Sequence, residues 1–160
     1  MHTTVGPGRT TVSAIAERAG VQRHTVYAHF PDVPTLFTAC TAHWDSQHPR
    51  PAPEHWDDPD PKLRRERALD ELYAWYESVE QDLVLFARDA ESVPSEVLES
   101  RGEWRQSVHD RLTNGRPRRK TVRAAIGHAL EFETWRSLTS RQGLSRRAAV
   151  DAMLALVNSV

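Results

Sequence analysis

Apolar residues recur three and four positions apart along most of this chain, and the alternation typical of a β-strand is scarce. Near the N-terminus, Thr10 or Thr11 caps a predicted helix that Gly20 ends. A second predicted helix runs from about residue 22 to 30, and a third covers roughly 33–47. The pattern therefore predicts an all-α protein that begins with short helices.

A proline-rich stretch, residues 45–61, interrupts this pattern. It holds five of the ten prolines and almost no aliphatic residues. Because proline has no backbone N–H to donate, this stretch predicts a linker between two domains, residues 1–44 and 45–160. Beyond it the spacing predicts helices over 61–79, 83–91, 94–112, 117–139 and 146–160.

The last two predicted helices, 117–139 and 146–160, carry apolar residues on more than one side. A helix that is apolar nearly all round is buried on several faces. Two interpretations remain open: the pair is buried in the core of its own domain, or it packs against the same pair of a second subunit. We expect the second arrangement, a homodimer through these two segments.

The net charge of −1 conceals two strongly charged segments. Residues 45–100 hold six basic and 15 acidic side chains, a net charge of −9, whereas residues 101–123 hold eight basic and two acidic ones, a net charge of +6. Residues 1–44 have a net charge of only +1. The balanced total excludes a protein that coats nucleic acid with a uniformly basic surface, but not one with a local binding site.

Several classes of protein are disfavoured. Cys40 is the only cysteine, so a disulfide framework and a thiolate-rich zinc site are excluded. No apolar run approaches the ~20 residues of a membrane span, and the N-terminus lacks the pattern of a secretory signal, so we expect a cytoplasmic protein. The chain also lacks the common motifs of phosphate-binding loops, zinc proteases and serine hydrolases. We therefore expect no catalytic residues, cofactor or metal site; Cys40 with His43 leaves a metal or redox sensor as the alternative.

The first two predicted helices have the layout of a helix-turn-helix. Only Gly20 and Val21 separate them, and the second helix is short. In such motifs the second helix enters the major groove of DNA, and its N-terminal residues contact base edges. Val26 and Phe30, four residues apart, face inward, which leaves polar side chains outside. From the pattern alone, an ordinary helical hairpin remains the alternative.

The literal residues of this segment support the DNA-binding interpretation. They read Thr10-Thr11-Val12-x-x-Ile15-Ala16-x-x-Ala19-Gly20-Val21-x-x-x-Thr25-Val26-Tyr27-x-His29-Phe30-Pro31-Asp32-x-x-x-Leu36. This segment resembles the DNA-binding signature of the tetracycline-repressor (TetR) type regulators. The resemblance implies a dimeric transcriptional regulator, usually a repressor, that a small ligand in the C-terminal domain releases from operator DNA. It also implies phosphate contacts from Thr11, Tyr27 and His29, and base or adjacent backbone contacts from Gln22, Arg23, His24 and Thr25.

The sequence departs from the pattern of that family at three positions. Val33 replaces a lysine that usually reaches a phosphate, His24 replaces a small residue, and Gln22 replaces a serine. Since glutamine is a poor N-cap, we expect the start of the second helix to be less firmly fixed.

Proteins of this type begin with an amphipathic helix, which would end just before Gly6, and only five residues precede that glycine. Without it, Ile15, Val26 and Phe30 are expected to lose much of their cover. Either the true start lies upstream, or the protein is truncated and binds DNA poorly. The second case gives an alternative function: a dimeric helical ligand-binding or adaptor protein with a vestigial motif.

The C-terminal part supplies aromatic residues for an effector pocket. Pockets in helical domains lie between helices and are mostly apolar with a few polar groups. As lining residues for an unidentified small-molecule effector we select Tyr76, Phe86, Trp104 and His128. The alternative for each aromatic residue is an ordinary place in the core.

Overall fold

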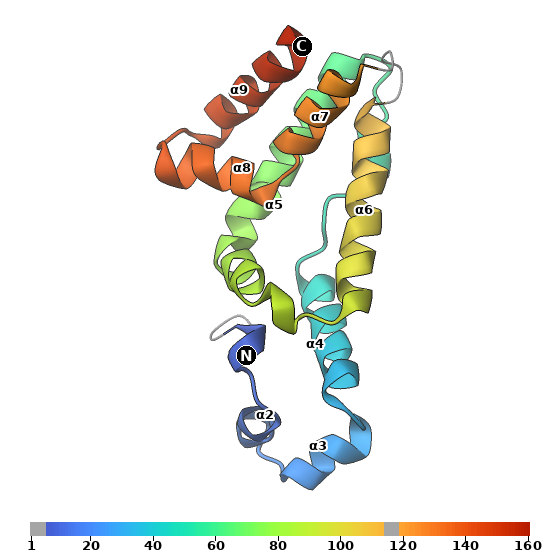
Figure 1. The fold of residues 1–160 in the computed structure, drawn as a ribbon, viewed down its shortest axis with the longest axis vertical. Coiled ribbons are helices and arrows are strands. Elements are labelled where there is room, and N and C mark those ends of the chain that lie inside the picture. The colour runs from blue at the N-terminus through green and yellow to red at the C-terminus, as the bar shows by residue number, and fades with distance from the viewer. Residues whose placement is uncertain (1–5, 114–118) are drawn as a thin grey trace. The chain divides into compact units, whose positions relative to one another are not determined.

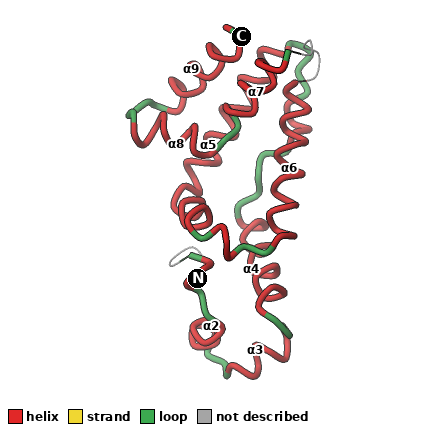
Figure 2. Tube along the Cα trace, in the orientation of Figure 1, coloured by secondary structure: helices red, strands yellow, loops and turns green. Residues whose placement is uncertain are grey.

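The computed structural model describes residues 6–113 and 119–160, and every regular element within these ranges is helical (Figures 1 and 2). This confirms the predicted all-α class. The chain divides into two compact units, each of which we describe by itself. The first combines the described residues up to Pro49 with Val79–Arg101, and the second combines Arg50–Ser78 with the described residues from Gly102 onward.

The first unit opens with three short helices. Helix α2 spans Val12–Ala19, α3 spans Arg23–His29 and α4 spans Val33–Gln47. The side chains of Ala16, Val26 and Leu36, one from each helix, form a small core against which partly buried apolar residues pack. These flanking residues are Val12, Ile15, Phe30 and Cys40.

The far end of α4 packs against a different part of the same unit. Phe37 joins a buried cluster with Val93 and Val97. Trp44 meets the edge of the Phe86 ring, with centroids 5.4 Å apart, and its Nε1–H donates to Asp82 over 2.6 Å. One helix thus links the small N-terminal core to residues far along the chain.

Helix α5 runs without a break over Pro61–Arg88. The prediction of two helices, 61–79 and 83–91, is therefore wrong. The polar residues Glu80, Gln81 and Asp82 weaken the apolar pattern there, but neither glycine nor proline interrupts the hydrogen-bond ladder. A 3-10 turn over Ala90–Ser92 follows, and helix α6 spans Ser95–Thr113.

The second unit contains helix α7, Lys120–Ala129, helix α8, Phe132–Arg136, a π-helical turn over Ser137–Arg141 and helix α9, Arg146–Ser159. The predicted continuous helix over 117–139 is wrong: it breaks at Leu130 and Glu131. Its first two residues, 117 and 118, lie outside the described residues.

Two buried tyrosines of α5 account for the position of this break. Tyr73 donates its hydroxyl to the carbonyl oxygen of Ala129 over 2.9 Å, and Tyr76 donates to that of Leu130 over 2.7 Å. These bonds satisfy carbonyl groups that have no partner at the end of a helix. The chain can therefore turn at this point inside the protein.

The proline-rich stretch is partly packed against α5. Trp56, within a 3-10 turn over Pro53–Trp56, is fully buried and donates its Nε1–H to Glu71 over 2.7 Å. This stretch therefore contributes to the core of the second unit. No described helix is long and apolar enough to cross a membrane.

Candidate DNA-binding site

Capping residues fix helix α2 at both ends. The Thr11 hydroxyl oxygen accepts a hydrogen bond from the Ala14 N–H over 3.2 Å, as an N-cap does. Gly20 ends the helix with φ +68°, a left-handed conformation that favours glycine. The Val21 N–H then donates to the Ala16 carbonyl over 3.0 Å, which closes the turn before α3.

Helix α3 begins at Arg23, and the side chain of its N-cap residue, Gln22, makes no capping hydrogen bond. The start of this helix depends instead on backbone bonds from Thr25 and Val26 to the Gln22 carbonyl. The weak cap predicted for Gln22 is thus confirmed.

The polar side chains of α3 lie outside, and the inward position of Val26 is confirmed. Arg23 and Tyr27 are one turn apart and share a side of the helix, and Thr25 and His29 share another. Gln22, Arg23, His24, Tyr27 and His29 are exposed, and Thr25 is half-buried. All six predicted contact residues on or beside α3 are thus accessible in the described unit.

Thr11 has two compatible roles. Its hydroxyl oxygen accepts the Ala14 N–H, but a hydroxyl also carries a proton that it can donate. Because Thr11 is exposed, that proton is accessible to a phosphate oxygen. The same side chain can therefore cap α2 and contact DNA.

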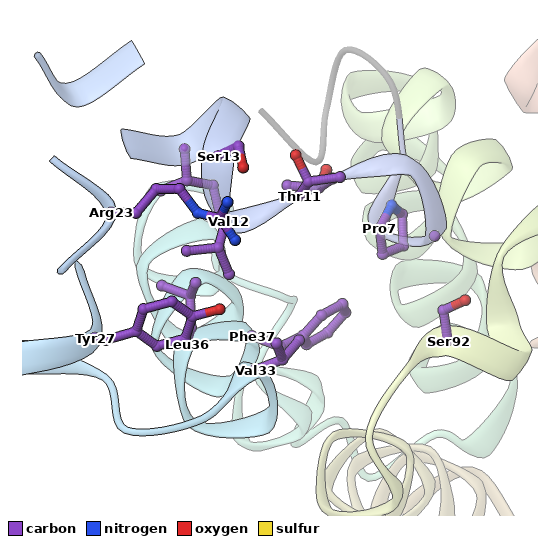
Figure 3. A pocket seen from close by; sticks show the side chains of 13 residues that line it. Pro7, Thr11, Val12, Ser13, Arg23, Tyr27, Val33, Leu36, Phe37 and Ser92 are labelled. Carbon is purple, nitrogen blue, oxygen red and sulfur yellow. The ribbon is translucent and has the colours of Figure 1, made fainter. Parts of the chain in front are cut away.

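A cavity of about 390 Å³ opens between the three short helices (Figure 3). Arg23 and Tyr27 of α3 converge on it with apolar residues of α2 and α4. Its lining also includes Pro7, Gly8, Thr10, Thr11, Val12, Ser13, Ile15, Val33, Leu36, Phe37 and Ser92. Of the three residues expected to lose cover, Ile15 and Phe30 are half-buried, but Val26 is buried, so that expectation is wrong for Val26.

The start of α4 differs in charge from a phosphate-binding helix start. Val33, 55% exposed, stands where a lysine is usual in the family that the segment resembles. Beside it the Asp32 carboxylate caps α4 by accepting the Thr35 N–H over 2.7 Å. This hydrogen bond keeps the pKa of Asp32 below its usual value, so the cap is negatively charged at neutral pH.

Three of the four residues selected for an effector pocket lie in the second unit. Tyr76 is buried and hydrogen-bonded to Leu130, and burial raises the pKa of its hydroxyl. Trp104 is half-buried, with its ring centroid 6.4 Å from that of Trp75, and donates its Nε1–H to the Pro51 carbonyl over 3.2 Å.

His128, the third of them, is exposed on α7, with its Nδ1 3.3 Å from the Thr134 hydroxyl. Phe86 belongs to the first unit, where it is buried against Trp44 and lies under the Arg101 guanidinium at 4.8 Å. The four residues are therefore divided between the two units.

Trp135 is a candidate that the sequence pattern did not single out. It is only 1% exposed, and its ring lies 5.7 Å from that of Tyr76 and 5.6 Å from that of Phe132. Within the part of the chain that the structure describes, its buried Nε1–H has no hydrogen-bond partner. A buried donor without a partner is costly, so this N–H is suited to bind an acceptor atom. Nothing in the sequence indicates which indole lacks a partner.

Cys40 lies half-buried at the edge of the small core between α2, α3 and α4. Burial raises the pKa of its thiol, which keeps it protonated and apolar in character. In residues 6–113 and 119–160, no three His, Cys, Asp or Glu side chains are grouped so that they could hold a metal ion.

Residues 1–40 match the family model of the bacterial regulatory proteins of the tetR family. Comparisons with the curated proteins and with the solved structures gave no match. The matched segment contains α2, the glycine turn and α3, whose exposed polar side chains form the candidate DNA-binding site. Through this segment, 40 of its 160 residues, the chain is similar to the tetR family, whose proteins are DNA-binding transcriptional regulators.

Proposed function

We propose that this protein is a transcriptional repressor that binds operator DNA as a homodimer and is released by a small-molecule effector. The observation that carries the proposal is the exposed polar surface of α3, which α2 and the Gly20 turn support within the segment that matches the family. The domain division proposed is residues 1–44 for DNA binding and 45–160 for effector binding and dimerisation.

The chemistry of the exposed side chains suits the major groove. The Arg23 guanidinium fits the two acceptor atoms of guanine, and the Gln22 amide fits adenine. The hydroxyl groups of Thr11 and Tyr27 and the ring of His29 suit phosphate oxygens, while His24 and Thr25 lie beside the base-reading residues. In a dimer the two α3 helices would enter successive major grooves, ~34–36 Å apart.

Dimerisation is proposed through the segments 117–139 and 146–160. The core-facing side of α9 carries Ala149, Val150, Met153, Leu154 and Val157. Its other side presents Ala148, Ala152, Ala155 and Leu156, the last of them 37% exposed. Small side chains allow two helices to approach closely, which supports an intersubunit contact at this side.

Effector binding is proposed in the second unit at Tyr76, Trp104 and His128, with Trp135 as an added anchor; Phe86 belongs to the first unit and is left out of this site. The aromatic rings of Tyr76, Phe132 and Trp135 lie within 5.4–5.7 Å of one another in the second unit. Such a cluster suits an apolar effector, and the Trp135 N–H calls for one hydrogen-bond acceptor on it. Binding would favour a subunit arrangement in which the two α3 helices no longer match the spacing of the grooves.

A gel shift on DNA flanking the protein's own gene, followed by footprinting, tests the proposal. A protected site with two-fold symmetric halves about one helical turn apart is the expected result. A protein that is dimeric but shifts no DNA would instead support the alternative, a helical ligand-binding or adaptor protein. The observation favouring that alternative is the valine at position 33 beside a negatively charged cap.

A further inference from the structure

We propose that Asp89, just after α5, is a positioning residue for DNA binding, because its carboxylate holds the Gly6–Gly8 segment that leads into α2. This inference rests on the proposed function and concerns the control of the same site. All the residues that form this contact belong to the first unit.

The Asp89 carboxylate joins two parts of the chain that are 81 residues apart. Its Oδ2 atom accepts the Gly8 N–H over 3.0 Å. Arg88 donates from Nε to Oδ1 over 2.7 Å and from Nη2 to Oδ2 over 2.8 Å, so the carboxylate is held in one orientation. Although it lies at the surface of the unit, the Asp89 side chain is only 11% exposed.

The N-terminal segment passes close to the side chains at this contact. Gly6 adopts φ +86°, and a Cβ atom there would overlap the Asp89 carboxylate and the Arg88 guanidinium. A Cβ atom on Gly8 would lie 3.0 Å from Ser92 Oγ and 3.1 Å from Asp89 Cγ. Glycine at both positions therefore allows the backbone to approach Asp89 closely.

Two hydrogen bonds within residues 6–10 connect this contact to the start of α2. The Thr10 hydroxyl donates to the Gly6 carbonyl over 2.8 Å, and the Thr10 N–H donates to the Pro7 carbonyl over 3.2 Å. The 3-10 turn over Pro7–Arg9 thus leads directly to Thr11, the N-cap of α2. The position of Thr11 relative to α3 is therefore set in part by Asp89.

The contact connects the end of α5 to the segment that leads into α2. Helix α5 is continuous from Pro61 to Arg88 and carries Tyr76, one of the proposed effector residues. A movement of its last turn would pull Asp89 from the Gly8 N–H and release the start of α2. Arg88 keeps the pKa of Asp89 down to about 2, so the carboxylate is fully charged at neutral pH.

The test compares Asp89→Ala and Asp89→Asn with Glu91→Gln, which removes an exposed charge two residues away. We expect Asp89→Ala to weaken binding to the DNA fragment identified by footprinting about tenfold, and Asp89→Asn to weaken it less, in fluorescence anisotropy. Glu91→Gln should bind like the wild type. Equal affinity of wild type and Asp89→Ala, or an equal loss in Glu91→Gln, would overturn the proposal.

Hydrogen exchange tests the contact between Asp89 and Gly8 without DNA, and therefore independently of the proposed function. The Gly8 amide should exchange at least tenfold faster in Asp89→Ala than in the wild type, whereas amides in α9 should not change. Asp89→Asn keeps the size of the side chain but replaces the charged acceptor with a neutral one, so it should raise the exchange rate of the Gly8 amide by a smaller factor, and it replaces Asp89→Ala if that variant fails to fold. An unchanged Gly8 amide would refute the contact, whereas a wild-type protein that binds no DNA would refute only the proposed function.

Discussion

At the scale of single residues, four of the six accessible side chains on and beside α3 divide by chemistry into two groups. Arg23 and Gln22 can read bases, whereas Tyr27 and His29 suit phosphates. This division leads to different expected effects of substitution, because a phosphate contact carries no sequence information.

Tyr27→Phe and His29→Ala should weaken binding to all DNA sequences by a similar factor. Each variant loses one of the proposed phosphate contacts, so His29→Ala in particular should change affinity without changing base preference. Anisotropy titrations on the operator and on a scrambled fragment measure both effects. A loss confined to the operator would place His29 among the base-reading residues.

Val33→Lys should strengthen DNA binding. The position is exposed at the start of α4, and the added cation should make the slope of log K against log salt steeper by about 0.9, the contribution of one phosphate. Val33→Glu, at the same position with the opposite charge, should weaken binding. An unchanged salt slope in Val33→Lys would show that this residue does not face the DNA backbone.

At the scale of elements, local signals in the sequence located most helix ends. Thr11 and Gly20 act as the caps that were expected of them, and Ser145 caps α9 by accepting the Ala148 N–H. The end of α7 was not predictable, because the hydroxyls that donate to its carbonyl groups belong to Tyr73 and Tyr76, 56 and 54 residues away. The continuity of α5 was missed for a related reason: packing maintains a helix where the local apolar pattern weakens.

Gly20→Ala should lower the free energy of unfolding by about 1–2 kcal/mol, because a Cβ atom is disfavoured in the left-handed conformation. Nothing lies within 4 Å of the added atom, so the backbone alone accounts for the cost. Urea unfolding measures the change.

Gly102→Ala is the matched control, since Gly102 lies inside α6 and its added Cβ atom also meets nothing within 4 Å. This substitution should raise the free energy of unfolding by roughly 0.5–1 kcal/mol. If both substitutions changed the free energy of unfolding in the same direction, the role given to the Gly20 turn would be contradicted.

At the scale of the whole molecule, charge does little to attract DNA. Residues 1–44 carry a net charge of only +1, and residues 45–100 carry −9. Affinity must therefore come mainly from aligned contacts rather than from bulk charge, and two recognition helices in a dimer provide twice as many of them.

Leu156→Glu should convert the proposed dimer into a monomer and weaken operator binding. The side chain lies on the side of α9 that faces away from its own core, so the substitution should leave the fold intact. Leu98→Glu on α6, at a residue that is also exposed, is the control and should remain dimeric. Light scattering after gel filtration measures the mass of each variant. If Leu156→Glu were still dimeric, this side of α9 would not belong to the interface.

The candidate DNA-binding site could be predicted from the sequence because it lies in one continuous segment whose residue types and spacing both carry information. The effector site could not be predicted to the same degree. The residues proposed for it come from α5, α6, α7 and α8, and only the fold separates Phe86 from Tyr76 or leaves the Trp135 N–H without a partner among the described residues. Long-range packing decides these features, and no local pattern encodes it.

The central claim is that α3 reads DNA sequence, and Arg23→Ala tests it most directly. The measurement is the ratio of affinities for the operator and for a scrambled fragment, at one fixed salt concentration, in wild type and variant. If Arg23 contacts a guanine, the variant should lose about 1–3 kcal/mol of discrimination at one base pair, and should also bind more weakly overall. An unchanged ratio, with equal losses on both fragments, would contradict the claim.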